Sequence, residues 1–490
     1  MAKEAPRFPR SCGLLLHPTS LPGPHGVGDL GAPARRLLEF LGAAGQSWWQ
    51  MLPVVPAGEA DSPYKAYSAF AGEPLLLSLD DLAEQGLLAS SPAPLPSPPG
   101  RVAFDSARSF KMKRLREAYG EFRKGGGGTG DFLEEQRAWL PDYALFSALK
   151  EEQSGRPWWE WPVPLRSRAP EALEEARARL ETEVAFQVFL QWLFRRQWKA
   201  LRLACAGAGV RLIGDLPIFV AQDSAEVWAR AELFRLDARG HPEAVAGVPP
   251  DYFNEEGQLW GNPLYRWDVM ESMGFAWWTA RLRAAYELFD AVRLDHFLGF
   301  CRGWEVPTGA RSAKEGRYVP GPGAAFFEAI LAALPGRHLI AEDLGAMTRE
   351  AAALRDRFAL PGMRVVQFAF GEQADERPHA FPRNAVVYSG THDNDTAAGW
   401  VASHPREHAR LLEYLGVDGR AGSWDLIRCA LSSVCDLAVV PAQDLLGLGA
   451  EARMNRPGVA RGNWAWRLGT DALDGKVAER LRRMVAVYGR

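Results

Sequence analysis

The segment Ala-Val-Arg-Leu-Asp-His-Phe at positions 291–297 places a carboxylate, Asp295, directly after a short apolar run. An apolar run of this length predicts a strand buried on both faces, as in a parallel sheet covered by helices. Two later segments follow the same plan. An acid follows a strand-like run in each of them: Glu342 within Ala-Glu-Asp-Leu-Gly, and Asp393 within Thr-His-Asp-Asn-Asp.

Short apolar runs of this kind recur along the whole chain. The predicted strands are 13–16, 49–54, 210–216, 290–294, 338–342, 363–368, 385–389 and 437–441. Helical patterns lie between most of them, at 33–44, 275–288, 324–334, 348–358 and 423–435. This alternation predicts an α/β protein built as a (β/α)8 barrel, in which the carboxyl ends of the strands, and with them the acids, converge. A doubly wound open sheet has the same alternation, and periodicity alone does not separate the two.

The length of the chain calls for large insertions in such a barrel. A plain barrel needs about 250 residues, whereas the chain has 490. We therefore expect one catalytic domain over 1–490, with insertion subdomains at about 56–185 and about 217–274, after the second and third strands. Since loops that follow barrel strands lie on the active-site face, both insertions are expected to form walls of a cleft.

The composition argues against several classes of partner. A net charge of −3 indicates neither a nucleic acid nor a membrane surface as partner. No apolar stretch is long enough to span a bilayer, and no segment has the features of a signal peptide. The five cysteines are scattered without Cys-x-x-Cys spacing, which argues against a disulfide framework. A cytoplasmic protein is expected, because this cysteine usage fits a reducing compartment.

Each of the three acids has a chemical and a structural interpretation. Arg293 and Asp295 are two residues apart on a strand and share a face, so the cation either keeps a nucleophile ionised or forms only a structural ion pair. Glu342 ends an apolar strand, where burial favours a general acid/base, or it caps the next loop. Asp393 stands in a dense polar group that suits sugar hydroxyls, an Asx turn or a divalent metal. Together, three converging carboxylates are typical of glycosidic bond chemistry.

Other chemistries have less support in the sequence. There is no Gly-rich dinucleotide fingerprint, no P-loop and no Gly-x-Ser-x-Gly elbow. A metallohydrolase built on His296, His392 and Asp393 is conceivable, but no paired His spacing of the zincin type supports it.

Eight stretches of the chain resemble the amylomaltases, the 4-α-glucanotransferase family of glycoside hydrolases (family 77). They are residues 13–23, 61–72, 214–220, 257–263, 293–297, 341–345, 391–395 and 462–464. Their order and spacing match from end to end, and the length is similar to that of the short form without starch-binding modules. The resemblance implies a retaining enzyme that moves α-1,4-glucan segments between maltooligosaccharides or starch chains, with glucose as an acceptor and cyclic glucans as a further product.

The resemblance also assigns roles to the acids. Asp295 matches the nucleophile, Glu342 the acid/base, and Asp393 the acid that holds sugar hydroxyls and stabilises the oxocarbenium-like transition state. A retaining mechanism implies that the carboxyls of Asp295 and Glu342 lie about 5–5.5 Å apart. The positions that match substrate-binding residues are Tyr64, Asp215, Trp260, Arg293, His296, Phe368, His392 and Asn463.

Transfer and hydrolysis share one covalent intermediate and differ in what attacks it. Loops that carry Trp260 and Asn463 and exclude water favour transfer. An α-glucan hydrolase is the alternative within the same class, and a catalytically silent glucan-binding protein is the alternative outside it. The resemblance implies no cofactor and no metal, and a monomer or weak oligomer.

Overall fold

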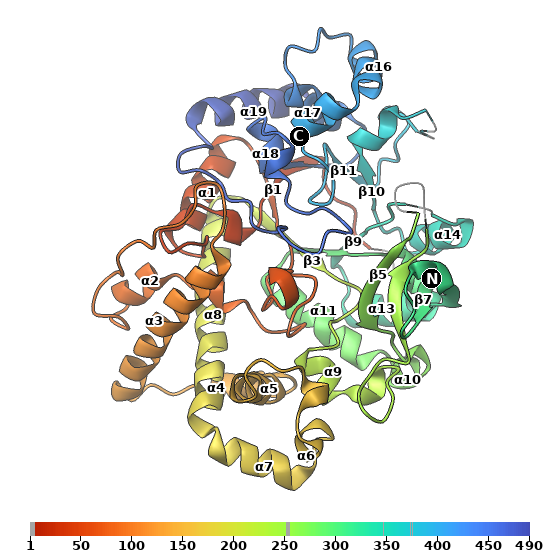
Figure 1. The fold of residues 1–490 in the computed structure, drawn as a ribbon. Helices are drawn as coiled ribbons and strands as arrows, with labels where there is room; N and C mark the ends of the chain where they lie inside the picture. Colours follow the sequence, from red (N-terminus) through yellow and green to blue (C-terminus); the bar gives the residue numbers. More distant parts are fainter. Residues whose placement is uncertain (1–4, 251–254, 346, 373, 375) are drawn as a thin grey trace.

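Eight parallel strands close into a barrel in the order in which they occur along the chain (Figure 1). The structure is a computed structural model that describes residues 5–250, 255–345, 347–372, 374 and 376–490. The strands are β1 (Ser11–Leu15), β2 (Trp48–Gln50), β3 (Arg211–Leu216), β6 (Ala291–Leu294), β9 (His338–Ala341), β10 (Gly362–Val365), β11 (Ala385–Tyr388) and β12 (Leu437–Pro441). β9 meets β10 where the Ala341 N–H donates to the Pro361 carbonyl at 2.9 Å. The predicted (β/α)8 barrel is therefore confirmed, and the open sheet is excluded.

Alternate residues of the strands fill the barrel and face the helices. One compact cluster of buried side chains lies inside the barrel and includes Leu15, Trp48, Ile213, Ile340, Met363, Val386 and Leu437. Their sequence neighbours, such as Leu14, Trp49 and Leu212, belong to the larger core outside. Because both faces are buried, these strands read as continuous apolar runs rather than as alternating ones.

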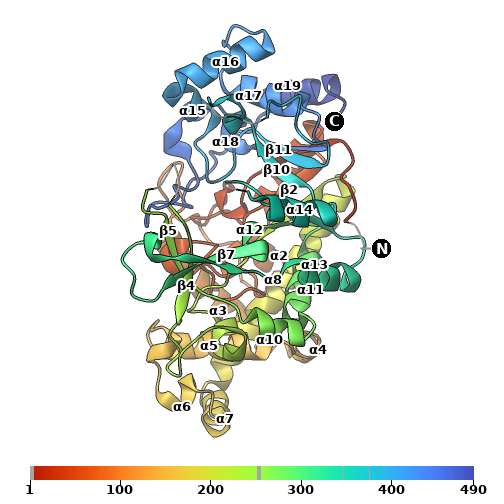
Figure 2. The same cartoon turned by 90° about the vertical axis from the view of Figure 1, so that its right-hand side faces the viewer.

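The helices surround the barrel and extend the molecule at both ends. Those matching the five predicted segments are α1 (Ala32–Ala43), α11 (Ala276–Leu288), α13 (Gly323–Ala333), α14 (Arg349–Arg357) and α17 (Ser423–Ser432). Figure 2 shows α17 at one end with α15 (Ala397–Ser403), α16 (Pro405–Leu415) and α19 (Gly475–Val487). Among the described residues, no helix is both long enough and apolar enough to cross a membrane.

Two additions to the barrel lie in the connections that follow β2, β3 and β6. Between β2 and β3 the chain forms a helical region that ends in the long helix α8 (Glu181–Gly207). Its helices are α2 (Leu79–Glu84), α3 (Phe104–Lys124), α4 (Gly130–Glu135), α5 (Leu140–Glu152), α6 (Val163–Arg166) and α7 (Pro170–Arg179). The second addition is an antiparallel sheet in the order β5 (Gln258–Pro263), β4 (Ala244–Val248), β7 (Arg302–Pro307) and β8 (Arg317–Pro320). This sheet, which the sequence did not predict, joins segments from before and after β6.

A close approach of β1 to β2 leads to a prediction about stability. A Cβ added at Gly13 would lie 2.6 Å from both the Cβ and the carbonyl oxygen of Trp48. Because backbone atoms cannot move aside as a flexible side chain can, we expect Gly13→Ala to lower the free energy of unfolding by about 1–3 kcal/mol. Denaturant unfolding measures this change.

Gly42→Ala is the matched control, since the same methyl group would have nothing within 4 Å in helix α1. That variant is expected to gain about 0.5–1 kcal/mol, because alanine is the better helix former. Equal stability of the two variants would contradict the close packing of β1 on β2.

Candidate active site

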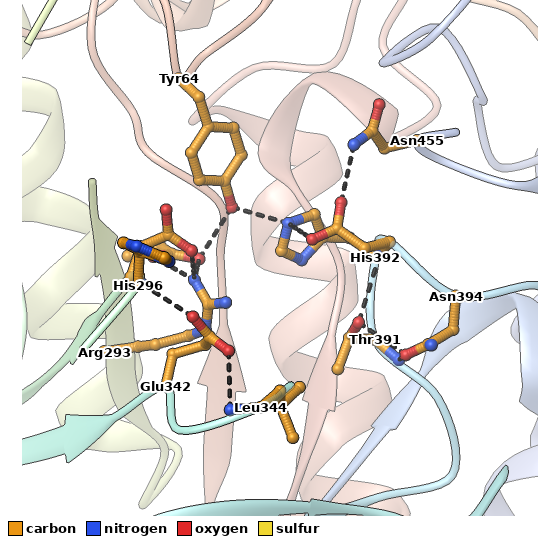
Figure 3. A network of polar contacts seen from close by, with 12 residues as sticks. Tyr64, Arg293, His296, Glu342, Leu344, Thr391, His392, Asn394 and Asn455 are labelled. Carbon is orange, nitrogen blue, oxygen red and sulfur yellow. Dashed lines mark hydrogen bonds and ion pairs between the residues drawn. The ribbon is translucent and has the colours of Figure 1, made fainter. Parts of the chain in front are cut away.

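The three acids lie at the carboxyl ends of the barrel strands. Figure 3 shows Glu342 and the residues around the acids, among them Arg293, Tyr64 and His392. Asp295 directly follows β6, and Glu342 directly follows β9, the neighbouring strand. Asp393 lies in the loop after β11. The barrel brings them together because strands that run parallel all end on the same face.

Arg293 links the Asp295 carboxylate to a second acid on the next strand. Its Nη1 donates to both carboxylate oxygens of Asp215 at 2.7 Å and to Asp295 Oδ1 at 2.9 Å. The side chains of Arg293 and Asp215 are buried, whereas that of Asp295 is 25% exposed. Burial disfavours the charge on Arg293, but the carboxylates of Asp215 and Asp295 outweigh it and raise the pKa of Arg293 well above its ordinary value. Asp295 is thus held by a permanent cation while part of its side chain stays accessible.

Glu342 is held by two backbone N–H groups. The N–H of His296 donates to Oε2 at 2.7 Å, and that of Leu344 donates to Oε1 at 3.0 Å. His296 adopts a φ of +52°, which is costly for a residue other than glycine and is typical of functional sites. Burial raises the pKa of Glu342 to about 8, although Arg293 and the two N–H groups act in the opposite direction. A carboxyl that keeps its proton at neutral pH can act as a general acid.

Tyr64 connects this group to the third acid. Its hydroxyl lies 2.9 Å from Asp215 Oδ2 and 2.9 Å from His392 Nε2, and that nitrogen lies 3.3 Å from Asp393 Oδ2. Burial and the charge of Asp215 raise the pKa of Tyr64 well above its ordinary value, so the phenol keeps its proton. The ion-paired carboxylate of Asp215 can only accept hydrogen bonds, so the Tyr64 hydroxyl donates to it. The Tyr64 oxygen then accepts a hydrogen bond from His392, which requires a proton on His392 Nε2.

Two residues that sequence reasoning missed contact Asp393. Asn455 Nδ2 donates to Asp393 Oδ1 at 2.7 Å, and Arg453 Nη2 donates to the Asp393 carbonyl at 2.8 Å. They lie beyond β12 along the chain, in an irregular loop that follows the 3-10 turn Ala450–Ala452. No local pattern marks them, because neither strand nor helix periodicity extends to this loop.

The remaining predicted residues divide into two groups. The Trp260 ring stands edge-on to His296, with 4.8 Å between ring centroids, and so borders the network. Phe368 follows β10 and is 48% exposed. In the described part of the chain, the side-chain hydrogen bonds of Asn463 stay within its own loop, to the Arg456 N–H and the Val459 carbonyl. The exposure of Phe368 and the hydrogen bonds of Asn463 therefore do not link either residue to the three acids.

The residues of the metallohydrolase alternative do not assemble into a metal site. His296 lies with Glu342 and Trp260, whereas His392 and Asp393 lie with Tyr64. Within the described ranges, no group of three or more His, Cys, Asp or Glu side chains could hold a metal ion.

Comparison with known proteins finds close relatives over the full length. The family model described as 4-alpha-glucanotransferase matches residues 16–471. The 4-alpha-glucanotransferase of Thermus thermophilus is 50% identical, with 97% of this chain and 98% of that protein covered. That of Synechocystis sp. is 45% identical, with 98% of each covered. Among solved structures, amylomaltase from Streptococcus agalactiae in complex with acarbose superposes with a TM-score of 0.95 at 33% identity, covering 98% of this chain and 99% of that one.

Proposed function

The chain belongs to the 4-alpha-glucanotransferase family, and on this premise we propose that Asp295, Glu342 and Asp393 perform a retaining double displacement. The enzyme transfers α-1,4-glucan segments between maltooligosaccharides or starch chains. The observation that carries the proposal is the polar network at the ends of the strands (Figure 3). Arg293, Asp215, Tyr64 and His392 link Asp295 to Asp393, and the N–H of His296, the residue after Asp295, donates to Glu342.

In the first step the glucan is transferred to the enzyme. A carboxylate oxygen of Asp295 attacks C1 of the donor sugar while the bond from C1 to the leaving oxygen breaks. Glu342 gives its proton to that oxygen, so the shortened glucan leaves as a neutral alcohol. The products are a β-glycosyl ester on Asp295 and an ionised Glu342.

In the second step an acceptor sugar attacks C1 of the ester. Glu342, now a carboxylate, takes the proton of the attacking hydroxyl, and the bond to Asp295 breaks. Two inversions restore the α configuration. In both steps Asp393 accepts hydroxyl hydrogens of the sugar, and its negative charge stabilises the oxocarbenium-like transition state.

The side chains around the acids hold the sugar bound at the cleaved bond. Direct contacts with the three acids support this role for Arg293, His296 and His392, and contacts with Arg293 and His392 support it for Asp215 and Tyr64. We propose that Phe368 and Asn463 contact sugars farther from the cleaved bond, and that Trp260 forms part of a wall that excludes water. Excluding water favours an acceptor sugar over hydrolysis at the same intermediate.

Several finer points complete the proposal. The acceptors include glucose, and intramolecular attack yields cyclic glucans. The protein acts as a monomer or weak oligomer in the cytoplasm, where its five free thiols stay reduced. We retain the domain limits set from the sequence, with insertion subdomains at about 56–185 and about 217–274.

Incubation with maltotriose tests the function. We expect glucose together with oligomers longer than maltotriose, because a glycosyl group released from one molecule is passed to another. Chromatography of the products over time measures this. Glucose and maltose without longer oligomers would indicate a hydrolase, and no products would indicate a silent glucan-binding protein. We expect EDTA to leave the rate unchanged, since each step is assigned to side chains.

A further inference from the structure

Asp393 is more exposed than Asp295, and it depends on a loop for its orientation. Its side chain is 41% exposed, against 25% for Asp295. Within its own segment, the Asp393 N–H donates to Thr391 Oγ1 at 3.3 Å, and Oδ2 lies 3.3 Å from His392 Nε2. Residues 453–455 supply further contacts. Besides the two contacts to Asp393, the Asn455 N–H donates to the His392 carbonyl at 3.0 Å.

We propose that Asn455 is a positioning residue for the Asp393 carboxylate, and that Arg453 fixes the backbone beneath it. This inference rests on the proposed function, because it concerns how Asp393 meets the sugar. Asn455 holds Oδ1 at 2.7 Å, while Oδ2 faces His392 at 3.3 Å. The hydrogen bond from Asn455 therefore restricts the rotation of the Asp393 carboxylate. Figure 3 shows Asn455 and His392 in this group.

The chemistry of the amide suits this role better than that of a cation would. A lysine or arginine on Oδ1 would neutralise the charge that has to face the developing positive charge on the sugar. An amide N–H holds the oxygen without adding a charge and does not titrate. The cation that the loop does provide, Arg453, is directed at the Asp393 carbonyl, with Nη2 at 2.8 Å, and not at the carboxylate.

Asn455→Asp gives the test a pH readout that loss of packing would not produce. At about pH 7.5 the new carboxylate would repel Asp393, and we expect kcat for maltotriose transfer to fall on the order of 100-fold, the effect of a misplaced catalytic group. Two carboxyls so close share one proton and titrate at raised pKa. Lowering the pH toward about 5.5 therefore restores a donor to Asp393, and the deficit relative to wild type should shrink about tenfold or more.

Two further variants complete the experiment. Asn384→Asp makes the same change where the amide donates to a backbone carbonyl, Ala359, away from the acids; its activity relative to wild type should not depend on pH. Asn455→Ala removes the donor without adding a charge, and we expect kcat to fall about 10-fold at both pH values with KM nearly unchanged. Thermal unfolding confirms that each variant is folded.

The outcomes separate this inference from the proposed function. If the wild type transfers glucan and folded Asn455→Asp is either as active as wild type or equally impaired at both pH values, the positioning role is wrong. Wild-type activity of Asn455→Ala would also overturn it. If the wild type itself forms no longer oligomers from maltotriose, the proposed function fails instead.

Discussion

Asp295→Asn is expected to lower the rate of maltotriose transfer by about 10⁴-fold or more, the effect of removing a nucleophile that acts with its partners as a unit. The amide has nearly the same shape as the carboxylate, and its oxygen can still accept from Arg293 Nη1, now at 2.9 Å from Asp295 Oδ1. It cannot form the glycosyl ester. The initial rate of glucose release at saturating maltotriose measures the loss, and thermal unfolding checks that the fold is intact.

Asp268→Asn makes the same substitution on the surface. Asp268 is 76% exposed and lies 3.8 Å from Arg266, and an exposed pair of this kind contributes little to stability. We expect the wild-type rate from this variant. A rate for Asp295→Asn within about tenfold of wild type would show that another group attacks the sugar.

The barrel could be predicted because its strands are buried on both sides. Continuous apolar runs mark such strands directly, and β12 was predicted with its observed limits, Leu437–Pro441. The end of a strand was harder to predict where the apolar run continues beyond it. The run predicted at 363–368 leaves the sheet at Val365 and continues as the 3-10 helix Val366–Phe370, in which every side chain except that of Phe368 is buried. The apolar residues there predict burial, but they do not predict the change from strand to 3-10 helix.

The antiparallel sheet could not be found in the same way. Its edge strands, Gln258–Pro263 and Arg317–Pro320, are partly exposed and contain proline, and the first also contains glycine. The pairing of β4 with β7 also spans the whole of β6, so no local pattern records it. Long-range pairing of this kind follows from the closed barrel and not from any single segment.

The residues of the site also differ in whether the sequence alone could identify them. The acids could be found because each follows a strand whose end the sequence marks. Tyr64 and Asp215 were inferred only through the family resemblance, since hydrogen bonds such as that from Tyr64 to Asp215 join residues 151 positions apart. Asn455 was missed, because its contact with Asp393 spans 62 positions and begins in an irregular loop.

The pH dependence of the wild-type enzyme should show the titration of Glu342. Burial raises the pKa of this carboxyl to about 8. Below that pH Glu342 holds the proton that the leaving oxygen needs, and above it the proton is lost. We therefore expect the rate of transfer from maltotriose to fall as the pH rises through about 8.

Glu342→Gln removes the proton donor, so the rate from maltotriose should fall on the order of 10²–10⁴-fold and no longer show this alkaline limb. Glu328→Gln, at an ion pair with Arg357 whose two side chains are each 52% exposed, is the matched control and should behave as wild type. A donor with a good leaving group, such as α-maltosyl fluoride, needs no proton in the first step. Glu342→Gln should therefore release fluoride quickly, once per enzyme, and then stop.

The burst should leave a maltosyl ester on Asp295, because the second step still needs a base to activate the acceptor. Mass spectrometry of the intact protein would detect the added maltosyl group, and peptide mapping would place it. Continuous turnover of the fluoride at the wild-type rate would show that another residue moves the proton. An ester found elsewhere than on Asp295 would leave the acid/base role standing and overturn the assignment of the nucleophile.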